Sequence, residues 1–204
     1  MWQKLNAEIL RLSRQGKYND AVFVAKNAVK VAEKNFGANH PKAATSMNNL
    51  ATLYRIIGRY DDAETYYRQA LIIQENAWGP DHPSVATSLN NLAGLYRARS
   101  RLTAAEPLYI RALQIREEAL GPDHPDVGQS MNNLGLLYKK MGRHAEAENL
   151  YNQALTIWER SLGPEDPNVA TLLENLAELY KTTGRENKAD ILLTRARRIR
   201  AISR

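Results

Sequence analysis

The sequence predicts an all-α fold of five stacked helix–turn–helix units, on the strength of two periodic features and one missing pattern. Glycine and proline recur every 42 residues, and columns of leucine, tyrosine and alanine recur in step with them. No segment shows the strict alternation of apolar and polar residues that marks a half-buried strand. A repeat of this length is typical of a solenoid, in which each unit buries its apolar stripe against its neighbours. The columns are Gly37, Gly79, Gly121 and Gly163; Pro41, Pro83, Pro125 and Pro167; Leu50, Leu92, Leu134 and Leu176; Tyr54, Tyr96, Tyr138 and Tyr180; and Ala21, Ala63, Ala105, Ala147 and Ala189.

Each unit reads as two helices, and the third unit shows the pattern most clearly. Pro83 suits a first helical turn, and we expect Asp81 to be the N-cap. An apolar stripe follows, and a turn near Ser100 separates it from a second stripe that ends at Gly121, a good residue for a helix C-terminus. We therefore predict one domain over residues 1–204, with units at about 1–36, 41–78, 83–120, 125–162 and 167–204.

The first and last units depart from the pattern as terminal units should. Leu12 replaces the tyrosine of the first helix in the first unit. Arg197 replaces a leucine of the second helix in the last unit, and a terminal repeat needs a polar outer face. Residues 1–180 contain 20 basic and 20 acidic side chains, whereas residues 181–204 contain eight basic and two acidic ones. We interpret the formal net charge of +6 as a property of this C-terminal cap.

The composition excludes several classes of protein. The chain has no cysteine, which removes disulfides, thiol nucleophiles and cysteine metal sites. No apolar run approaches the roughly 18 residues of a membrane span, and the start, MWQKLNAEIL, lacks the apolar centre of a signal peptide. We expect a cytoplasmic protein that does not insert into membranes.

The repeat columns resemble a known family. Leu92, Ala93, Tyr96, Ala105, Tyr109 and Ala112 have the spacing of the tetratricopeptide repeat (TPR), whose usual period is 34. With LGPDHP at 120–125, SLNNLAGLY at 88–96 and AEPLYIRALQIREEAL at 105–120, the chain resembles the TPR domain of kinesin light chains and their bacterial relatives over essentially its whole length. The resemblance implies a right-handed α-solenoid whose first helices line a concave groove for short extended peptides. No heptad coiled coil precedes the repeats, so we do not expect a motor-subunit function.

Three polar columns lie on the first helices, away from the apolar stripe. Asparagine is a poor residue inside a helix, by roughly half a kcal/mol relative to alanine, so its repetition needs a reason. A primary amide can bind both the N–H and the C=O of a peptide, and a flanking basic column would favour acidic residues. The resemblance implies peptide contact at the central asparagine column. The predicted peptide-binding residues are Asn49, Asn91, Asn133 and Asn175; Asn48, Asn90 and Asn132; and Arg55, Arg97, Lys139 and Lys181.

Structural roles for the same residues stay open. The amides can bond between adjacent first helices, or duplication can simply have copied them. The basic residues can complement the negative C-terminal end of a helix dipole. Glu174 and Glu178 replace earlier neutral residues in the last unit, which would give a groove an acidic end and fix peptide direction, or would merely form a solvated end.

Other residues are less informative about function. His40, His82 and His124 recur in loops too far apart to share a zinc ion, so we expect loop residues and no metal. The Tyr54 column is expected in the core, with each hydroxyl bound to a local partner. Trp158 is either an exposed anchor for a partner or a cover for its neighbour. No catalytic or cofactor motif is present, so we expect neither an enzyme nor a cofactor.

The sequence therefore predicts a protein–protein interaction scaffold that binds short, acidic, extended peptide segments of partner proteins. One alternative is a self-associating spacer, such as a homodimer held by Trp158 or by the chain ends. A weaker alternative is a binder of nucleic acid or an anionic surface through Arg195–Arg204. The last 24 residues contain no aromatic residue for base stacking, which disfavours nucleic acid.

Overall fold

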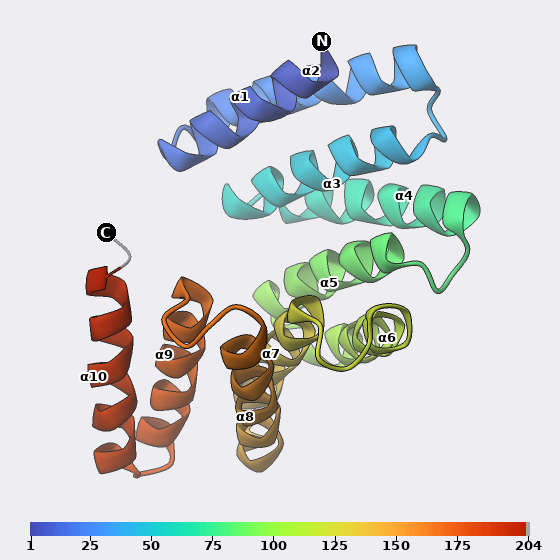
Figure 1. Ribbon diagram of the computed structural model, residues 1–204. Helices are drawn as coiled ribbons and strands as arrows, with labels where there is room; N and C mark the ends of the chain where they lie inside the picture. The colour runs from blue at the N-terminus through green and yellow to red at the C-terminus, as the bar shows by residue number, and fades with distance from the viewer. Residues whose placement is uncertain (203–204) are drawn as a thin grey trace. The chain divides into compact units, whose positions relative to one another are not determined.

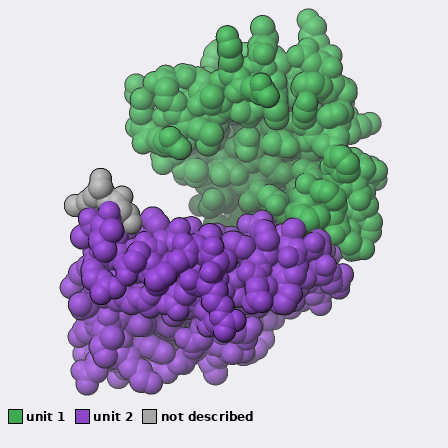
Figure 2. All heavy atoms as spheres, viewed as in Figure 1, with its two compact units in different colours: residues 1–101 green, residues 102–204 purple. Residues whose placement is uncertain are grey.

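The computed structural model describes residues 1–202, which form ten helices and no strand (Figure 1). The chain divides into two compact units, residues 1–101 and residues 102–204, which are coloured separately in Figure 2. The division falls between the two helices of the third predicted repeat. Each unit is a set of helices joined by short turns, as the periodic pattern predicts.

Unit 1 contains five helices in three layers. The α1–α2 pair, the α3–α4 pair and α5 follow one another in Figure 1. Consecutive helices pack together, and α3 also contacts α5 directly, so the first helices of adjacent repeats touch. The helices are α1 (Trp2–Arg14), α2 (Tyr18–Phe36), α3 (Pro41–Ile56), α4 (Tyr60–Trp78) and α5 (Pro83–Ala98).

Unit 2 contains five further helices and begins with α6, the second helix of the third repeat. Consecutive helices again pack together, and the first helices α7 and α9 touch each other. The helices are α6 (Leu102–Leu120), α7 (Pro125–Lys140), α8 (His144–Ser161), α9 (Pro167–Thr182) and α10 (Glu186–Ile202).

A histidine N-cap begins three of the first helices. The Nδ1 atoms of His40, His82 and His124 each accept a hydrogen bond from the backbone N–H two residues later, at 3.1 Å. Asp166 does the same before α9, at 2.7 Å. The expectation that Asp81 caps the third repeat is therefore wrong by one residue. With proline as the first helical residue, the residue directly before it occupies the cap.

The turns between the two helices of a repeat require a left-handed backbone. Glycine supplies it in four turns, with φ of 71° at Gly16 and similar values at the equivalent glycines. Ser100 occupies this position in the third repeat with φ of 57°, and it is the one non-glycine residue among residues 1–202 with a positive φ. A side chain in this conformation costs roughly 1–2 kcal/mol.

The core consists of the predicted columns. The leucine and tyrosine columns of the first helices and the alanine column of the second helices are all buried. Small alanine side chains let neighbouring helices approach closely, and the larger leucine and tyrosine side chains fill the space between them.

Trp158 also belongs to the core, with only 3% of its surface exposed. The interpretation of Trp158 as an exposed anchor is wrong. Its indole N–H donates to the Pro125 carbonyl at 2.9 Å, and the ring covers the neighbouring helix α7 at Gly128.

Candidate functional site

The asparagine columns form hydrogen bonds between neighbouring first helices. Asn49 Nδ2 on α3 donates to Asn6 Oδ1 on α1 at 3.2 Å. In unit 2, Asn175 Nδ2 on α9 donates to Asn132 Oδ1 on α7 at 2.9 Å. Both bonds join residues 43 positions apart, so they are the same contact made in two different repeats. The structural role left open for the amides, a hydrogen bond between adjacent first helices, is therefore observed at these two sites.

The two asparagine columns differ in how much of their surface is exposed. Asn48, Asn90 and Asn132 are 7%, 8% and 5% exposed, so little of their surface is open to a ligand. Asn48 Nδ2 donates to Ser88 at 2.8 Å across to α5, and Asn48 Oδ1 is buried with no partner among residues 1–202. The central column of Asn49, Asn91, Asn133 and Asn175 is only half-buried. Of the two columns, the central one is therefore the more accessible to a partner.

Asn6 is a member of the Asn48 column that the sequence analysis did not include. It lies 42 residues before Asn48, so the repeat period alone could have found it. The first helix of the first repeat has lost its tyrosine and several of its apolar positions, which hid this match.

A groove of about 730 Å³ lies between α1 and α3 in unit 1. Its lining is largely apolar, and none of the lining residues is charged. Leu10 and Ile56 are 60% and 44% exposed and belong to this lining. Asn49 contributes a polar group to the groove. The lining residues are Trp2, Gln3, Asn6, Ala7, Ile9, Leu10, Ser13, Thr45, Asn49, Thr52, Leu53 and Ile56.

The four residues of the predicted basic column have different environments. Arg55 is half-buried and interacts with the hydroxyl of Tyr67; burial raises the pKa of that phenol, and the arginine opposes the rise. Arg97 is half-buried. Lys139 forms an ion pair with Glu178 at 2.7 Å. Lys181 is exposed and forms no ion pair with any residue that the structure describes.

The carboxylates of the last repeat are paired within unit 2. Glu178 binds Lys139, and Glu174 binds Arg200 at 3.1 Å. Each acidic residue therefore has a cationic neighbour, which reduces the acidic character expected at this end of the first-helix face.

Tyrosine, glutamate and arginine form a recurring cluster that links one repeat to the next. The Tyr96 hydroxyl donates to Glu64 at 2.9 Å, and Arg101 lies 4.5 Å from the centre of the Tyr96 ring. Tyr180 and Glu148 repeat the bond at 3.0 Å in unit 2, where Arg185 lies over the ring. The expected local partner of the tyrosine hydroxyl is confirmed at both sites.

The basic C-terminal helix is largely neutralised by carboxylates of unit 2. Arg195 pairs with Glu159 at 2.5 Å, and Arg198 pairs with Glu165 at 2.7 Å. Arg185, at the turn before α10, pairs with Glu148 at 2.8 Å. Arg204 lies outside the described residues. These pairs leave fewer free cations on the tail than its sequence suggests.

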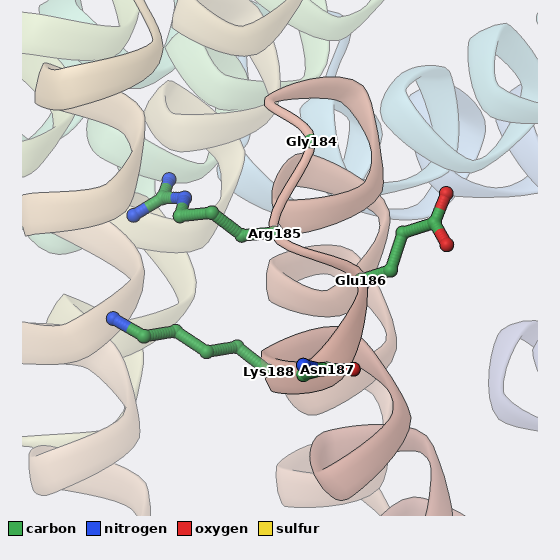
Figure 3. Close-up of a pocket in the computed structure, with 5 residues that line it drawn as sticks. All are labelled: Gly184, Arg185, Glu186, Asn187 and Lys188. Atoms are coloured by element: carbon green, nitrogen blue, oxygen red, sulfur yellow. The ribbon is translucent and has the colours of Figure 1, made fainter.

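A hollow of about 300 Å³ lies at the turn from α9 to α10, lined by Gly184 to Lys188. Figure 3 shows Arg185 and Lys188 reaching to one side of this turn and Glu186 to the other. Because Arg185 is bound to Glu148 and also lies over Tyr180, this hollow belongs to the structural cluster described above.

When charges are counted for each compact unit, the net positive charge lies in unit 1, at the N-terminal end of the chain. Unit 1 holds 14 basic and 8 acidic side chains, and unit 2 holds 14 of each. The formal +6 therefore belongs entirely to unit 1, because residues 102–180 carry an acidic excess that offsets the tail. A division at residue 180 hides this distribution, because the positive charge of residues 1–101 and the acidic excess of residues 102–180 then cancel.

Within residues 1–202 there is no cluster of three or more histidine, aspartate or glutamate side chains arranged to hold a metal ion. None of the helices in the same range is long and apolar enough to cross a lipid bilayer.

Comparison with known proteins identifies the class. A tetratricopeptide-repeat family model matches residues 7–76, 57–109, 84–159 and 132–201. The chain belongs to the tetratricopeptide-repeat family, whose members are generally protein–protein interaction scaffolds and generally not enzymes. The all-α fold of stacked helix pairs is thereby confirmed. A search of curated proteins gave no match.

Solved structures place the chain beside kinesin-light-chain-like TPR proteins, as the resemblance predicted. It is 28% identical to BtubC (BKLC) from P. vanneervenii, with a TM-score of 0.81 over 98% of this chain and 80% of that one. It is 26% identical to a Podospora anserina protein described as a kinesin light chain with nearly identical TPR-like repeats, with a TM-score of 0.75 over 99% and 96%. A Rap protein complexed with competence and sporulation factor shares the fold at 18% identity, with a TM-score of 0.82 over 95% and 52%.

Proposed function

We propose that this chain is an interaction scaffold that binds an extended segment of a partner protein in the groove between α1 and α3. The observation that carries the proposal is an uncharged, largely apolar groove on the first helices of unit 1. Exposed large apolar side chains that border such a groove are typical of an interaction site. TPR proteins in general bind other proteins, which supports a peptide as the occupant.

The groove can hold both the side chains and the backbone of such a segment. Ile9 and Leu53 are buried beneath it, and Leu10 and Ile56 are exposed to contact apolar side chains of the partner. Asn49 donates one N–H to Asn6, but its Oδ1 has no hydrogen-bond partner among residues 1–202. An amide with a free acceptor can bind a peptide N–H whatever the peptide's side chains are.

A preference for acidic segments depends on the basic column. In unit 1, which contains the groove, the column contributes Arg55 and Arg97, and both are half-buried. Apolar contacts at the α1–α3 groove therefore carry the proposed binding, and acidic residues would add to it.

The test is a peptide-array screen of this chain, followed by affinity measurement for the best peptide. The double variant Leu10→Glu with Ile56→Glu should weaken binding by about tenfold or more, because it places charge at an apolar contact. Both residues are exposed, so circular dichroism should show unchanged helicity. Phe23→Glu is the matched control, because Phe23 is 77% exposed on α2 and does not line the groove.

A second double variant, Asn91→Ala with Asn133→Ala, tests the central asparagine column. Loss of affinity at unchanged stability supports peptide contact by the amides. Loss of stability at unchanged affinity shows that they serve the fold. If the Leu10 and Ile56 variant binds as tightly as the parent, the proposed groove is wrong. A dimer in light scattering that dissociates in that variant would favour self-association through this surface.

A further inference from the structure

The unneutralised charge of unit 1 is concentrated on its first repeat. Residues 1–36 contain seven basic and three acidic side chains. Arg11 pairs with Glu8 at 2.6 Å. The remaining six cations are exposed and form no ion pair with any residue in 1–202: they are Lys4, Arg14, Lys17, Lys26, Lys30 and Lys34. The first repeat thus carries a concentration of free positive charge, far in sequence from the basic C-terminus.

Three of these lysines form a row along α2. Lys26, Lys30 and Lys34 are spaced by four residues, so their side chains lie on one ridge about 6 Å apart and span about 12 Å. Like charges at this spacing destabilise a helix by about 0.2–0.5 kcal/mol per pair. None of the other second helices has three cations in this row. The equivalent residues are Arg68, Ile72 and Asn76; Ile110, Gln114 and Glu118; Asn152, Thr156 and Arg160; and Thr194, Arg198 and Ile202.

A second groove runs beside this row, between the second helices α2 and α4. It has a volume of about 440 Å³. Its apolar lining comes from Val29 on α2 and from Met47 and Leu50 on α3, while Lys26, Lys30 and Glu33 contribute from α2 and Tyr66 and Gln69 from α4. The groove therefore combines apolar surface with the amino groups of the lysine row.

Unit 2 has two corresponding positions: Glu117 and Gln153 form no ion pair, whereas the other position contains one. Glu159 and Arg195 occupy the positions of Glu33 and Gln69 three repeats later, and they are 2.5 Å apart between α8 and α10. In unit 1, Gln69 replaces the arginine, so no ion pair joins α2 to α4 at this point. The row of unpaired lysines is also absent from α8.

We propose that the α2–α4 groove is a second docking surface, which binds an acidic segment of a partner protein. Carboxylates of that segment pair with Lys26, Lys30 and Lys34, and an apolar side chain enters the groove over Met47 and Leu50. Charge complementarity carries the proposal, because these lysines have no carboxylate partner within the described chain. The surface lies on the second helices, so it is separate from the α1–α3 groove.

The lining favours a protein segment over a phosphate polymer. An apolar floor offers no hydrogen bond or charge to a phosphate backbone, whereas it can contact an apolar side chain of a protein segment. The Tyr66 ring is stacked on Tyr54, with centroids 5.9 Å apart, so only its other face is open to a partner. Gln69 can donate to and accept from a peptide backbone.

The experiment uses the whole chain and a fluorescein-labelled peptide of Glu-Glu-Leu repeats, followed by fluorescence anisotropy. The triple variant Lys26→Glu, Lys30→Glu, Lys34→Glu should weaken binding by about tenfold or more, since several surface ion pairs are lost together. The Lys→Gln triple variant should show a smaller loss, because it removes attraction without adding repulsion. Binding to the parent should weaken as salt is raised.

The matched control is Arg160→Glu, Lys188→Glu, Arg197→Glu, which makes the same charge change on exposed residues of unit 2. It should change the affinity by less than about twofold if the lysine row is the site. Circular dichroism should show equal helicity in all variants. A Gln-Gln-Leu repeat peptide should not bind measurably.

Several outcomes would overturn the proposal. One is a lysine-row variant that binds the acidic peptide as the parent does, and another is equal binding of the glutamine peptide. Loss of acidic-peptide binding in the Leu10→Glu, Ile56→Glu variant alone would place the segment in the first groove. Tighter, lysine-dependent binding of duplex DNA or of phosphatidylserine vesicles would assign the row to nucleic acid or to a membrane surface.

Discussion

The Trp158 indole fits against Gly128 so closely that a methyl group at Gly128 would lie 2.7 Å from the indole nitrogen. Three other repeats have alanine at the position of Gly128, and they have Gln74, Arg116 or Arg200 in place of the tryptophan. The fourth repeat therefore differs at two positions that compensate each other: a larger side chain on α8 and a smaller one on α7.

Gly128→Ala should therefore destabilise the protein by about 1–3 kcal/mol, the usual cost of overfilling a core. The double variant Gly128→Ala with Trp158→Arg recreates the pair Ala86 and Arg116 and should recover most of the loss. Urea unfolding of the parent, both single variants and the double variant gives the coupling energy. Additive effects of the two substitutions would contradict the compensation.

Ser100→Gly should stabilise the protein by roughly 0.5–1 kcal/mol. Serine at φ of 57° is strained, and relief of this strain exceeds the greater chain entropy that glycine has when unfolded. The measurement is the midpoint of urea unfolding. Gly142→Ala is the reverse control, since Gly142 has φ of 78° in the equivalent turn and should lose about 1 kcal/mol. A less stable Ser100→Gly variant would show that the serine side chain contributes more than its conformation costs.

His82→Ala should lower the free energy of unfolding by about 1 kcal/mol, because α5 loses the acceptor for the Ser84 N–H. His82→Asp should keep the stability near that of the parent, since Asp166 already makes the same bond before α9. Thermal unfolding of the three proteins distinguishes a capping role from a packing role. Equal losses in both variants would mean that the imidazole ring, stacked 5.1 Å from Trp78, matters more than its Nδ1.

Glu64 should make unit 1 sensitive to acid. Burial opposes ionisation of its carboxyl, but hydrogen bonds from Tyr96 and Arg68 and the charge of Arg101 outweigh burial, so its pKa lies below 4.5. A group with a lowered pKa stabilises the fold above its unfolded pKa and loses that contribution as pH falls through the folded pKa.

Glu64→Gln should therefore be less stable than the parent by roughly 1 kcal/mol at neutral pH. The difference should shrink as pH falls from about 5 to about 3, because the parent then loses its carboxylate while glutamine is unaffected. Chemical unfolding at several pH values measures both curves. A constant difference across this range would show that the charge of Glu64 does not stabilise the protein.

The helices could be predicted from the sequence because their signals are local. Proline after a capping residue begins a helix, glycine with positive φ ends one, and the apolar stripes identify the buried faces. The tyrosine column that contains Tyr96 is buried as predicted, and the hydroxyls of Tyr96 and Tyr180 are hydrogen-bonded. Only the identity of the cap, His82 in place of Asp81, was wrong, by one residue.

The candidate site depended more on contacts between distant residues. A helical wheel placed Asn48 and Asn49 side by side on a polar face, but only the neighbouring helices bury Asn48 and leave Asn49 half-exposed. The wheel likewise could not show that Trp158 is buried, because the space for its ring is created by Gly128 on another helix. The α1–α3 groove depends on how two helices that are not consecutive in the sequence pack.

The sequence by itself determined five helix pairs of one family. The residues that form each turn and each apolar stripe lie close together in the chain and recur every 42 residues. The tertiary structure decided which cationic side chains have a carboxylate partner within the described residues and which do not. Arg195, Arg198 and Arg200 look like an unpaired basic tail in the sequence, yet they bind Glu159, Glu165 and Glu174. Lys26, Lys30 and Lys34 look ordinary, yet no carboxylate in the described chain reaches them. Ion pairs form between residues that folding brings together, so position along the chain cannot show which charges remain for a partner.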